Sequence, residues 1–217
     1  MIRKKAFTLI ELLIVVAIIA ILAAIAVPNF LEAQTRSKVA RIKADMRSIA
    51  TGLEGYITDF NEYPPDFKQL QEIGVLAKPV PEGLPIHINS LKALTTPVAY
   101  MSSLPKDVFA EKGFKEKEGN IKRTQPDCFM YRALSLAVGD LNLGAETDCF
   151  DRGFRWILQS VGPSKDKTNY GGSGGATLTA IKICAGDQGL YVYDPTNGTT
   201  SHGLIIRTNK GEFTGED

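Results

Sequence analysis

The pattern of apolar and polar residues divides the first sixty residues of the chain into two helical halves. Residues 12–31 carry no charge, and only Pro28 and Asn29 interrupt their apolar character. Farther along, apolar residues recur every three or four positions, which predicts an amphipathic helix with one core-facing stripe. The stripe consists of Val39, Ile42, Met46, Ile49, Leu53, Ile57 and Phe60. A continuous helix from Phe7 to about Thr58 would be about 80 Å long.

Turn-forming residues end this helix and separate short strands in the rest of the chain. Asn61 favours a turn, and Pro64 and Pro65 cannot continue a helix. Segments rich in β-branched and aromatic residues follow between turn signals, as is typical of strands. They are residues 128–134, 154–161, 177–184, 188–193 and 203–208, while 134–144 fits a short helix or an insertion loop. We therefore expect an α+β fold, in which a small antiparallel sheet lies across the second half of the long helix.

The apolar segment near the N-terminus has three interpretations. A cleaved secretory signal has a basic start, a short apolar core and a small-residue cleavage site after that core. Here Arg3, Lys4 and Lys5 form a basic start, but the apolar run of about 20 residues is long enough to span a bilayer. A plain single-pass anchor explains this length and places the basic residues in the cytoplasm. Neither interpretation explains Glu11, a carboxylate inside an apolar helix.

The third interpretation comes from the string KKAFTLIELL, residues 4–13, which resembles the N-terminal signal of type IV pilins and type II secretion pseudopilins. In that family a prepilin peptidase cuts before the apolar run. The resemblance therefore implies cleavage between Ala6 and Phe7 and N-methylation of Phe7, although most relatives have Gly at the position of Ala6. The chain would divide into a basic leader 1–6, a transmembrane and filament-core helix 7–30, an amphipathic helix 31–60 and a periplasmic region 61–217.

Cleavage at this position would give Glu11 a partner. A new α-amine on Phe7 is largely cationic at neutral pH, and the dipole of a helix disfavours a cation but favours a carboxylate at its N-terminus. The Phe7 amine of one subunit can therefore pair with Glu11 of a neighbour. Such a pair gains roughly 4 kcal/mol at about 4 Å, much of which desolvation removes. We expect it to set the register between subunits. The alternative is that Glu11 only marks the membrane edge.

Small residues and one proline shape the rest of the apolar half. Alanines at positions 17, 20, 23, 24 and 26 allow helices to approach closely. Pro28 lacks a backbone donor, so we expect a kink or local unwinding there. The resemblance places Pro28 where filament-forming relatives have a helix-breaking proline, and so assigns it to assembly together with Phe7 and Glu11.

The resemblance continues beyond the helix and favours the major pseudopilin of type II secretion. Tyr63-Pro64, residues 91–94 (LKAL) and residues 104–107 (LPKD) match motifs of that protein, although Val108-Phe109-Ala110 replaces its Pro-Trp-Gly turn. Residues 78–88 and 111–127 are insertions. The resemblance implies a structural subunit of a periplasmic filament, with its N-terminus in the cytoplasm and its domain beyond the inner membrane.

The implied partners are other copies of the chain, minor pseudopilins, the prepilin peptidase, an inner-membrane platform protein and an assembly ATPase. The alternative is a subunit of a type IV pilus, a surface fibre for adhesion, motility or DNA uptake. A membrane-tethered binding module or enzyme would need a pocket with convergent polar groups, and the sequence shows none. We therefore expect no catalysis by the chain itself.

Candidate metal ligands gather in one loop of the periplasmic region, YDPTNGTTSHG, residues 193–203. Calcium takes six to eight oxygen ligands, and the resemblance places a structural calcium site in this region. The candidate ligands are Asp194, Asn197, Thr199 and Ser201. Because only one of them is a carboxylate, a turn that needs no metal is the other interpretation. No cofactor is otherwise required.

The remaining chemistry-bearing residues indicate no further site. Three cysteines permit one internal bridge, and strand order favours Cys149–Cys184 in an oxidising periplasm, with Cys128 as a buried thiol. They form no C-x-x-C motif, and neither His87 nor His202 has a partner at metal-ligand spacing. The Gly-rich segment 169–178 lacks the Lys-Ser/Thr ending of a phosphate loop. No basic patch with interleaved aromatic residues suggests nucleic-acid binding.

Overall fold

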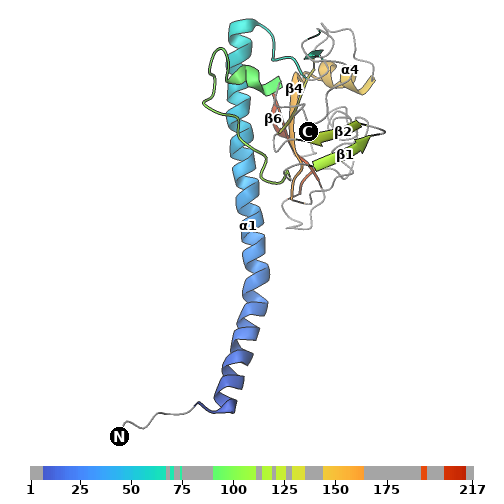
Figure 1. The fold of residues 1–217 in the computed structure, drawn as a ribbon. Coiled ribbons are helices and arrows are strands. Elements are labelled where there is room, and N and C mark those ends of the chain that lie inside the picture. The colour runs from blue at the N-terminus through green and yellow to red at the C-terminus, as the bar shows by residue number, and fades with distance from the viewer. Residues whose placement is uncertain are drawn as a thin grey trace.

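One long helix dominates the computed structural model of the protein. The structure describes residues 7–66, 69–70, 74, 90–110, 114–118, 121–125, 129–134, 144–163, 192–194 and 203–213. Helix α1, Leu9–Phe60, contains 52 residues, which confirms the expected continuous rod. The second half of α1 lies along the folded domain, and its first half extends away from it (Figure 1).

Both ends of α1 are formed by local capping. Thr8 is extended and caps the first turn, so the helix begins two residues later than predicted. At the other end Asn61 adopts a left-handed backbone with φ of 57°, and its N–H donates to the carbonyl of Ile57 at 2.8 Å. Asn tolerates this conformation better than most residues, which confirms the predicted turn there.

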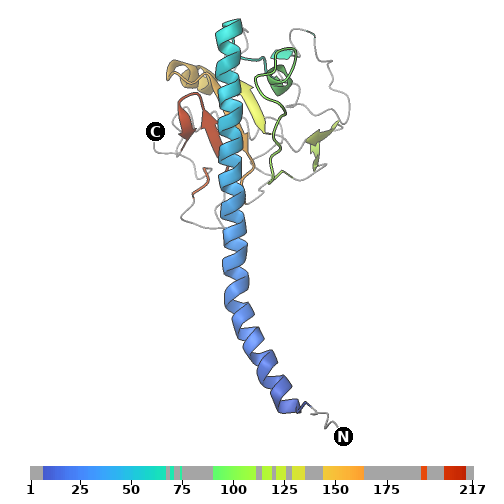
Figure 2. The same ribbon diagram turned by 90° about the vertical axis from the view of Figure 1, so that its left-hand side faces the viewer.

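Pro28 lies inside α1, which is helical on both sides of it. The expected local unwinding is therefore wrong for the chain by itself. The missing donor removes one backbone hydrogen bond, whereas the bonds of the neighbouring turns remain and hold the helix together. Figure 2 shows the apolar half as a gradual curve and not as a broken rod.

The domain contains a four-stranded antiparallel sheet in the order β3-β4-β5-β6. The strands are β3 (Met130–Ala133), β4 (Trp156–Ser160), β5 (Ile205–Thr208) and β6 (Gly211–Phe213). The first three confirm predicted strands, and β6 was not predicted. Residues 177–184 lie outside the described residues. Of the expected strand 188–193 only the end is described, where Val192 forms a parallel bridge with Leu204.

Three further elements lie around this sheet. The insertion after residue 111 contains a separate antiparallel hairpin of β1 (Phe114–Glu118) and β2 (Ile121–Gln125). A helix, α4 (Gly144–Asp151), precedes β4, and a single 3-10 turn, η1 (Lys92–Leu94), packs on α1. Most of residues 134–144 lies outside the described residues, so the structure does not test the helix expected there.

The hydrophobic core is formed by residues of α1 and of the sheet that pack against one another. The predicted stripe is buried from Val39 to Leu53, and Ile42, Ile49 and Leu53 are fully buried. They join Leu94, Trp156, Leu158 and Ile206 in one cluster. The last two predicted members are outside the core, because Ile57 is half-buried and Phe60 is 47% exposed. The ring of Phe60 instead stacks on Tyr56 with a centroid separation of 4.4 Å.

Two glycines allow a loop to pack closely on the end of α1. A Cβ on Gly55 would come within 2.9 Å of the Tyr100 ring, and one on Gly52 would lie 3.5 Å from Leu94. The hydroxyl of Tyr100 donates to Asp59 at 2.5 Å, which keeps this ring against the helix. Gly55 is therefore required for a close approach, which its weak helix propensity alone did not indicate.

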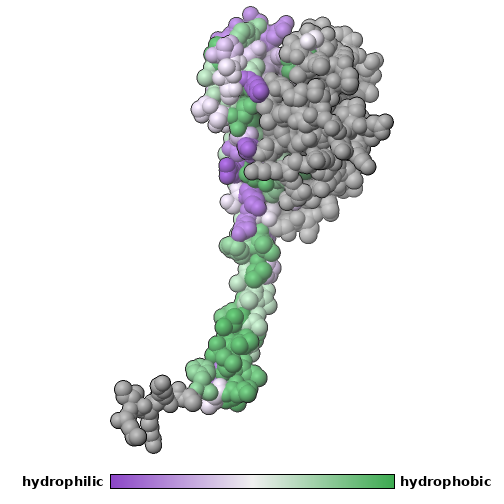
Figure 3. Space-filling model, in the orientation of Figure 1, coloured by the Kyte–Doolittle hydropathy of each residue, from purple (hydrophilic) through white to green (hydrophobic). Residues whose placement is uncertain are grey.

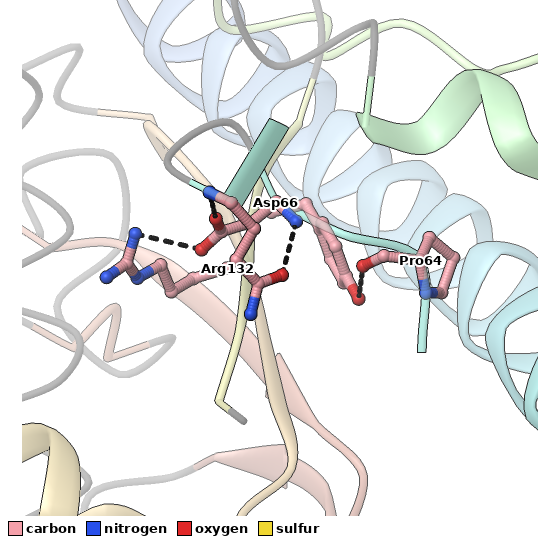
Figure 4. A network of polar contacts seen from close by, with 5 residues as sticks. Pro64, Asp66 and Arg132 are labelled. Carbon is pink, nitrogen blue, oxygen red and sulfur yellow. Dashed lines mark hydrogen bonds and ion pairs between the residues drawn. The ribbon is translucent and has the colours of Figure 1, made fainter. Parts of the chain in front are cut away.

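A buried polar network joins the segment after α1 to the sheet (Figure 4). Asp66 is almost fully buried and pairs with Arg132 of β3 at 2.8 Å. The backbone N–H of Gln69 donates to Asp66, and the N–H of Asp66 donates to the Gln69 side chain, both at 2.9 Å. The hydroxyl of Tyr131 donates to the carbonyl of Pro64 at 3.0 Å. This network positions the chain that follows α1.

Candidate assembly surface

The first half of α1 is an apolar surface that the chain itself does not cover. All residues from Phe7 to Leu31 are exposed. Among the described residues, sixteen large apolar side chains in this range are exposed, from 46% at Val15 to 79% at Leu9. Figure 3 shows this green, hydrophobic rod extending below the charged part of the helix.

Such a surface is not stable in water. Burying one large apolar side chain contributes about 1.5–3 kcal/mol, so covering sixteen of them is worth on the order of tens of kcal/mol. In the described part of the chain, α1 is the one helix that has the length and apolar composition to cross a bilayer. None of the residues in its most apolar stretch of 18 is buried. Lipid or other helices must therefore cover it.

Thr8 and Glu11 form a reciprocal cap at the start of this surface. The N–H and the hydroxyl of Thr8 donate to Glu11 Oε2 at 2.9 and 2.6 Å, and the N–H of Glu11 donates to Thr8 Oγ1 at 3.3 Å. This role of Thr8 was not predicted from the sequence, although Thr-x-x-Glu before an apolar run is the signal of a capping box.

The cap changes the interpretation of Glu11. The carboxylate is exposed and already has partners within its own chain. Both of these bonds use Oε2, so Oε1 can accept a donor from another molecule. The Thr8 cap therefore fixes the orientation of the Glu11 carboxylate. Its second oxygen, Oε1, remains available to a cationic group of a neighbouring molecule.

The predicted processing site lies immediately before the cap. The side chain of Phe7 is 75% exposed, and Ala6 lies outside the described residues. Cleavage between the two would leave the new α-amine on the residue next to the N-cap. No distance from that amine to Glu11 of another chain follows from a single subunit, so their pairing stays a prediction.

Three ion pairs lie on the second half of α1, and of these the Lys43 pair is half-buried. Arg36 pairs with Glu32 at 2.5 Å and Arg41 with Asp45 at 3.7 Å, each one helical turn apart, and Lys43 pairs with Glu212 of β6. Exposed pairs contribute about 0–1 kcal/mol each. They orient side chains on the helix and contribute little to folding.

Glu54 links the end of α1 to the sheet. Its carboxylate accepts from Trp156 Nε1 at 3.0 Å and from the Tyr63 hydroxyl at 3.1 and 3.2 Å. Partial burial, and then the charge of Glu54, raise the pKa of Tyr63 to about 12. The Tyr63-Pro64 motif thus has a structural role here, since Tyr63 fixes the segment that follows α1 to Glu54 of the helix.

Asp107 fixes the LPKD segment to the end of β4. Its carboxylate accepts the N–H of Phe109 at 2.9 Å and that of Val161 at 3.1 Å, while its carbonyl accepts the N–H of Ala110. A turn therefore forms although Val108-Phe109-Ala110 replaces the family's Pro-Trp-Gly. Burial raises the pKa of Asp107 above its usual value, against the lowering effect of these bonds.

The other predicted site residues are only partly described. Asp194 is exposed, whereas Asn197, Thr199 and Ser201 lie outside the described residues. The described residues contain no cluster of three His, Cys, Asp or Glu side chains suited to a metal. Cys149 is buried in α4, and its expected partner Cys184 lies outside the described residues, as does Cys128. The calcium and disulfide predictions remain untested.

Comparison with known proteins finds a matching family model and several relatives. Residues 1–27 match the prokaryotic N-terminal methylation motif. The type IV major pilin protein PilA of Myxococcus xanthus is 48% identical over 28% of this chain and 28% of its own length. The type IV wide pilus major component PilA4 of Thermus thermophilus is 42% identical over 36% of this chain and 59% of its own length. No solved structure matches the chain.

A third relative aligns over a longer segment. The type II secretion system core protein G of Pseudomonas aeruginosa is 32% identical over 105 residues, which are 48% of this chain and 68% of the relative. The chain thus spans less than two thirds of the length of the two pilins, but slightly more than two thirds of this protein. These relatives are structural subunits, and nothing in the comparisons points to catalysis.

Proposed function

Because the chain belongs to the family of type IV pilins and type II secretion pseudopilins, we propose that it is a structural subunit of the periplasmic pseudopilus of a type II secretion system. The observation that carries this proposal is the uncovered apolar half of α1, attached to a folded domain. Lipid covers this half before assembly, and the same half of other copies covers it in the filament.

Processing and topology belong to the same proposal. The prepilin peptidase cuts between Ala6 and Phe7 and the new amine is methylated, which the methylation motif over residues 1–27 and the exposed Phe7 support. Arg3, Lys4 and Lys5 keep the N-terminus in the cytoplasm. The domain is then periplasmic, and the inner membrane holds the subunit until it enters the filament.

In the filament, the Phe7 amine of an incoming subunit pairs with Glu11 of a neighbour. The Thr8 cap supports this role, because it orients the acceptor carboxylate in each subunit before assembly. The amine binds Oε1 while Oε2 stays with Thr8. Minor pseudopilins, a platform protein and an assembly ATPase are the further partners of this proposal, and the chain supplies no catalytic step.

A type IV pilus is the second candidate, and the relatives give a specific reason for it. The two pilins share 48% and 42% identity with the chain, against 32% for the secretion protein. Those two alignments cover only 61 and 77 residues of the chain. The alignment with the secretion protein covers 105 residues and a larger share of both proteins, which supports the pseudopilus.

Deletion of the gene distinguishes these two functions. For a pseudopilus we expect the cells to retain their secreted proteins in the periplasm and keep any surface fibres. Loss of fibres with normal secretion would identify a pilus instead.

Mass spectrometry of the mature protein should find a chain that begins at Phe7 and is heavier by one methyl group. A chain that still carries Met1, or that starts after Ala26, would contradict the processing.

A calcium site and a disulfide bridge that stabilise the domain are also part of the proposal. Calcium would bind Asp194, Asn197, Thr199 and Ser201; their donor atoms are all oxygen, which fits calcium, but they include only one carboxylate. A chelator should then lower the melting temperature of the domain, and an unchanged temperature would exclude the site. A Cys149–Cys184 bridge would appear as a linked peptide pair without reductant, and two alkylated thiols would exclude it.

A further inference from the structure

The second half of α1 and the short segment after it carry most of their positive and negative charges in two bands. Residues 32–47 contain five basic residues and two acidic residues, whereas residues 48–66, which include the end of α1 and the segment after it, contain four acidic residues and no basic one. We define the basic band as Arg36, Lys38, Arg41 and Arg47, and the acidic band as Glu54, Asp59 and Glu62. Lys43 and Asp66 are left out because each forms an ion pair with a charged residue of the sheet, which neutralises it.

The charges of both bands are accessible to another molecule. Lys38 and Arg47 are exposed and make no ion pair with any residue that the structure describes. Arg41 is 69% exposed in spite of its 3.7 Å contact with Asp45. Asp59 and Glu62 are exposed as well. In Figure 3 the hydrophilic part of the helix begins where the apolar half ends.

An open face of the helix connects the two bands. Small residues recur on it every three or four positions, all of them exposed, so a second rod can approach closely. These residues are Ala33, Ser37, Ala40, Ala44, Ser48 and Thr51. The face continues directly from the apolar half, so a partner that covers that half can also reach the bands.

Identical parallel rods with this charge pattern favour one axial displacement over another. If two copies lay in register, each band would face a band of its own sign. Arg41 and Asp59 represent the centres of the bands and are 18 residues apart, which corresponds to about 27 Å along a helix. A displacement of this size places the basic band of one copy beside the acidic band of the other.

We propose that the basic band of one subunit docks on the acidic band of a neighbouring subunit displaced by about 27 Å along the helix axis. This inference rests on the proposed filament function and adds how neighbouring domains find their register. Each exposed pair is weak and screened by salt. The bands therefore select an axial position, while the apolar half supplies the adhesion.

An anionic membrane surface is the competing partner for the basic band. The interfacial layer extends only about 5–8 Å beyond the hydrocarbon core. Arg36 lies five residues beyond Leu31 and could reach it, but Arg47 lies sixteen residues beyond, about 24 Å along the helix. A lipid surface also gives no role to the acidic band on the same rod, so a second copy fits the observations better.

Charge reversal tests the docking in cells that express the full chain. One variant carries Lys38→Glu and Arg47→Glu, and the other carries Asp59→Lys and Glu62→Lys. Each alone should lower the yield of sheared filament about tenfold relative to wild type, because like charges now face each other. Expressing the two variants together should restore the yield, and so should one chain with all four changes.

Controls separate docking from folding and from lipid binding. The neutral pair Asp59→Asn and Glu62→Gln keeps an acceptor for Tyr100 and should lower the yield less than the reversal does. Equal amounts of each variant in the membrane fraction confirm insertion. The inference is wrong if single reversals leave the yield unchanged, or if neither combination restores it. If only the basic-band variant loses filament yield, and neither combination restores it, the basic band binds lipid and the inference is wrong as well. Absence of wild-type filaments would overturn the proposed function itself.

Discussion

The two halves of α1 share one continuous backbone and differ in what covers them. From Phe7 to Leu31 every side chain is exposed, whereas Ile42, Ile49 and Leu53 are fully buried against the domain. Both halves contain many aliphatic residues, so composition alone does not separate them. The periodicity of the apolar residues does separate them. A helix with one apolar stripe buries that stripe by packing on one domain, whereas a helix that is apolar on all sides must be surrounded by lipid or by other helices.

Matched leucines should show this difference most strongly. Leu53→Ala removes a buried side chain and should lower the free energy of unfolding of the domain by about 2–5 kcal/mol. Leu22→Ala changes a side chain that is 61% exposed and should leave the melting temperature of the domain unchanged. Thermal unfolding of both proteins in detergent measures the effect. Equal destabilisation would mean that the first half packs on the domain.

The two glycines of the second half provide a narrower test of close packing. Gly55→Ala places a Cβ 2.9 Å from the Tyr100 ring and should destabilise the domain by about 1–3 kcal/mol. At Gly52 the new Cβ would make an ordinary 3.5 Å contact with Leu94, so alanine there should be neutral or stabilise by up to about 1 kcal/mol. Chemical denaturation compares the two, and a larger loss for Gly52→Ala would contradict the packing.

Tyr63 makes the attachment of the second half sensitive to high pH. Its pKa of about 12 in the folded protein lies above the ordinary value of 10.0. A raised pKa in the folded state gives stability that is complete below pH 10 and is lost as the pH rises toward 12. Glu54→Gln removes the charge and should bring the tyrosinate absorbance transition of Tyr63 to lower pH. An unchanged transition would show that Glu54 has no part in the shift.

The smallest predicted effect lies at the start of the first half. Thr8→Ala removes the side chain that caps α1 and should cost about 1 kcal/mol of helix stability, whereas Thr8→Ser keeps the hydroxyl and should match wild type. Amide hydrogen exchange of the first turn in lipid micelles reports the difference. Identical exchange in the alanine variant would show that Thr8 does not cap the helix.

Sequence periodicity predicted the rod, the buried stripe as far as Leu53 and three strands of the sheet. It did not predict the exposure of Phe60, because an apolar residue in the last turn can stack on a local neighbour such as Tyr56 instead of the core. The role of Gly55 depends on the position of Tyr100, which is 45 residues away in the chain. Short polar strands such as β6 carry no apolar pattern of their own.

For the candidate site, sequence identified the apolar surface and Glu11 but not the cap on Glu11. The signal was present, since Thr8 stands three residues before Glu11, but the carboxylate was interpreted only through its partner in another subunit. Pro28 was expected to kink or locally unwind the helix, yet α1 is helical on both sides of it. Contacts that depend on other copies cannot be obtained from one chain.

Photo-crosslinking from the apolar half tests the central claim most directly. A photoreactive amino acid at Ile19, which is 59% exposed, is introduced into the full chain in cells that express its assembly partners. If the apolar halves of neighbouring copies pack together, irradiation should give a ladder of dimers and higher multimers of this chain. A product that contains only monomers or lipid adducts, from a protein correctly inserted in the membrane, would contradict the account.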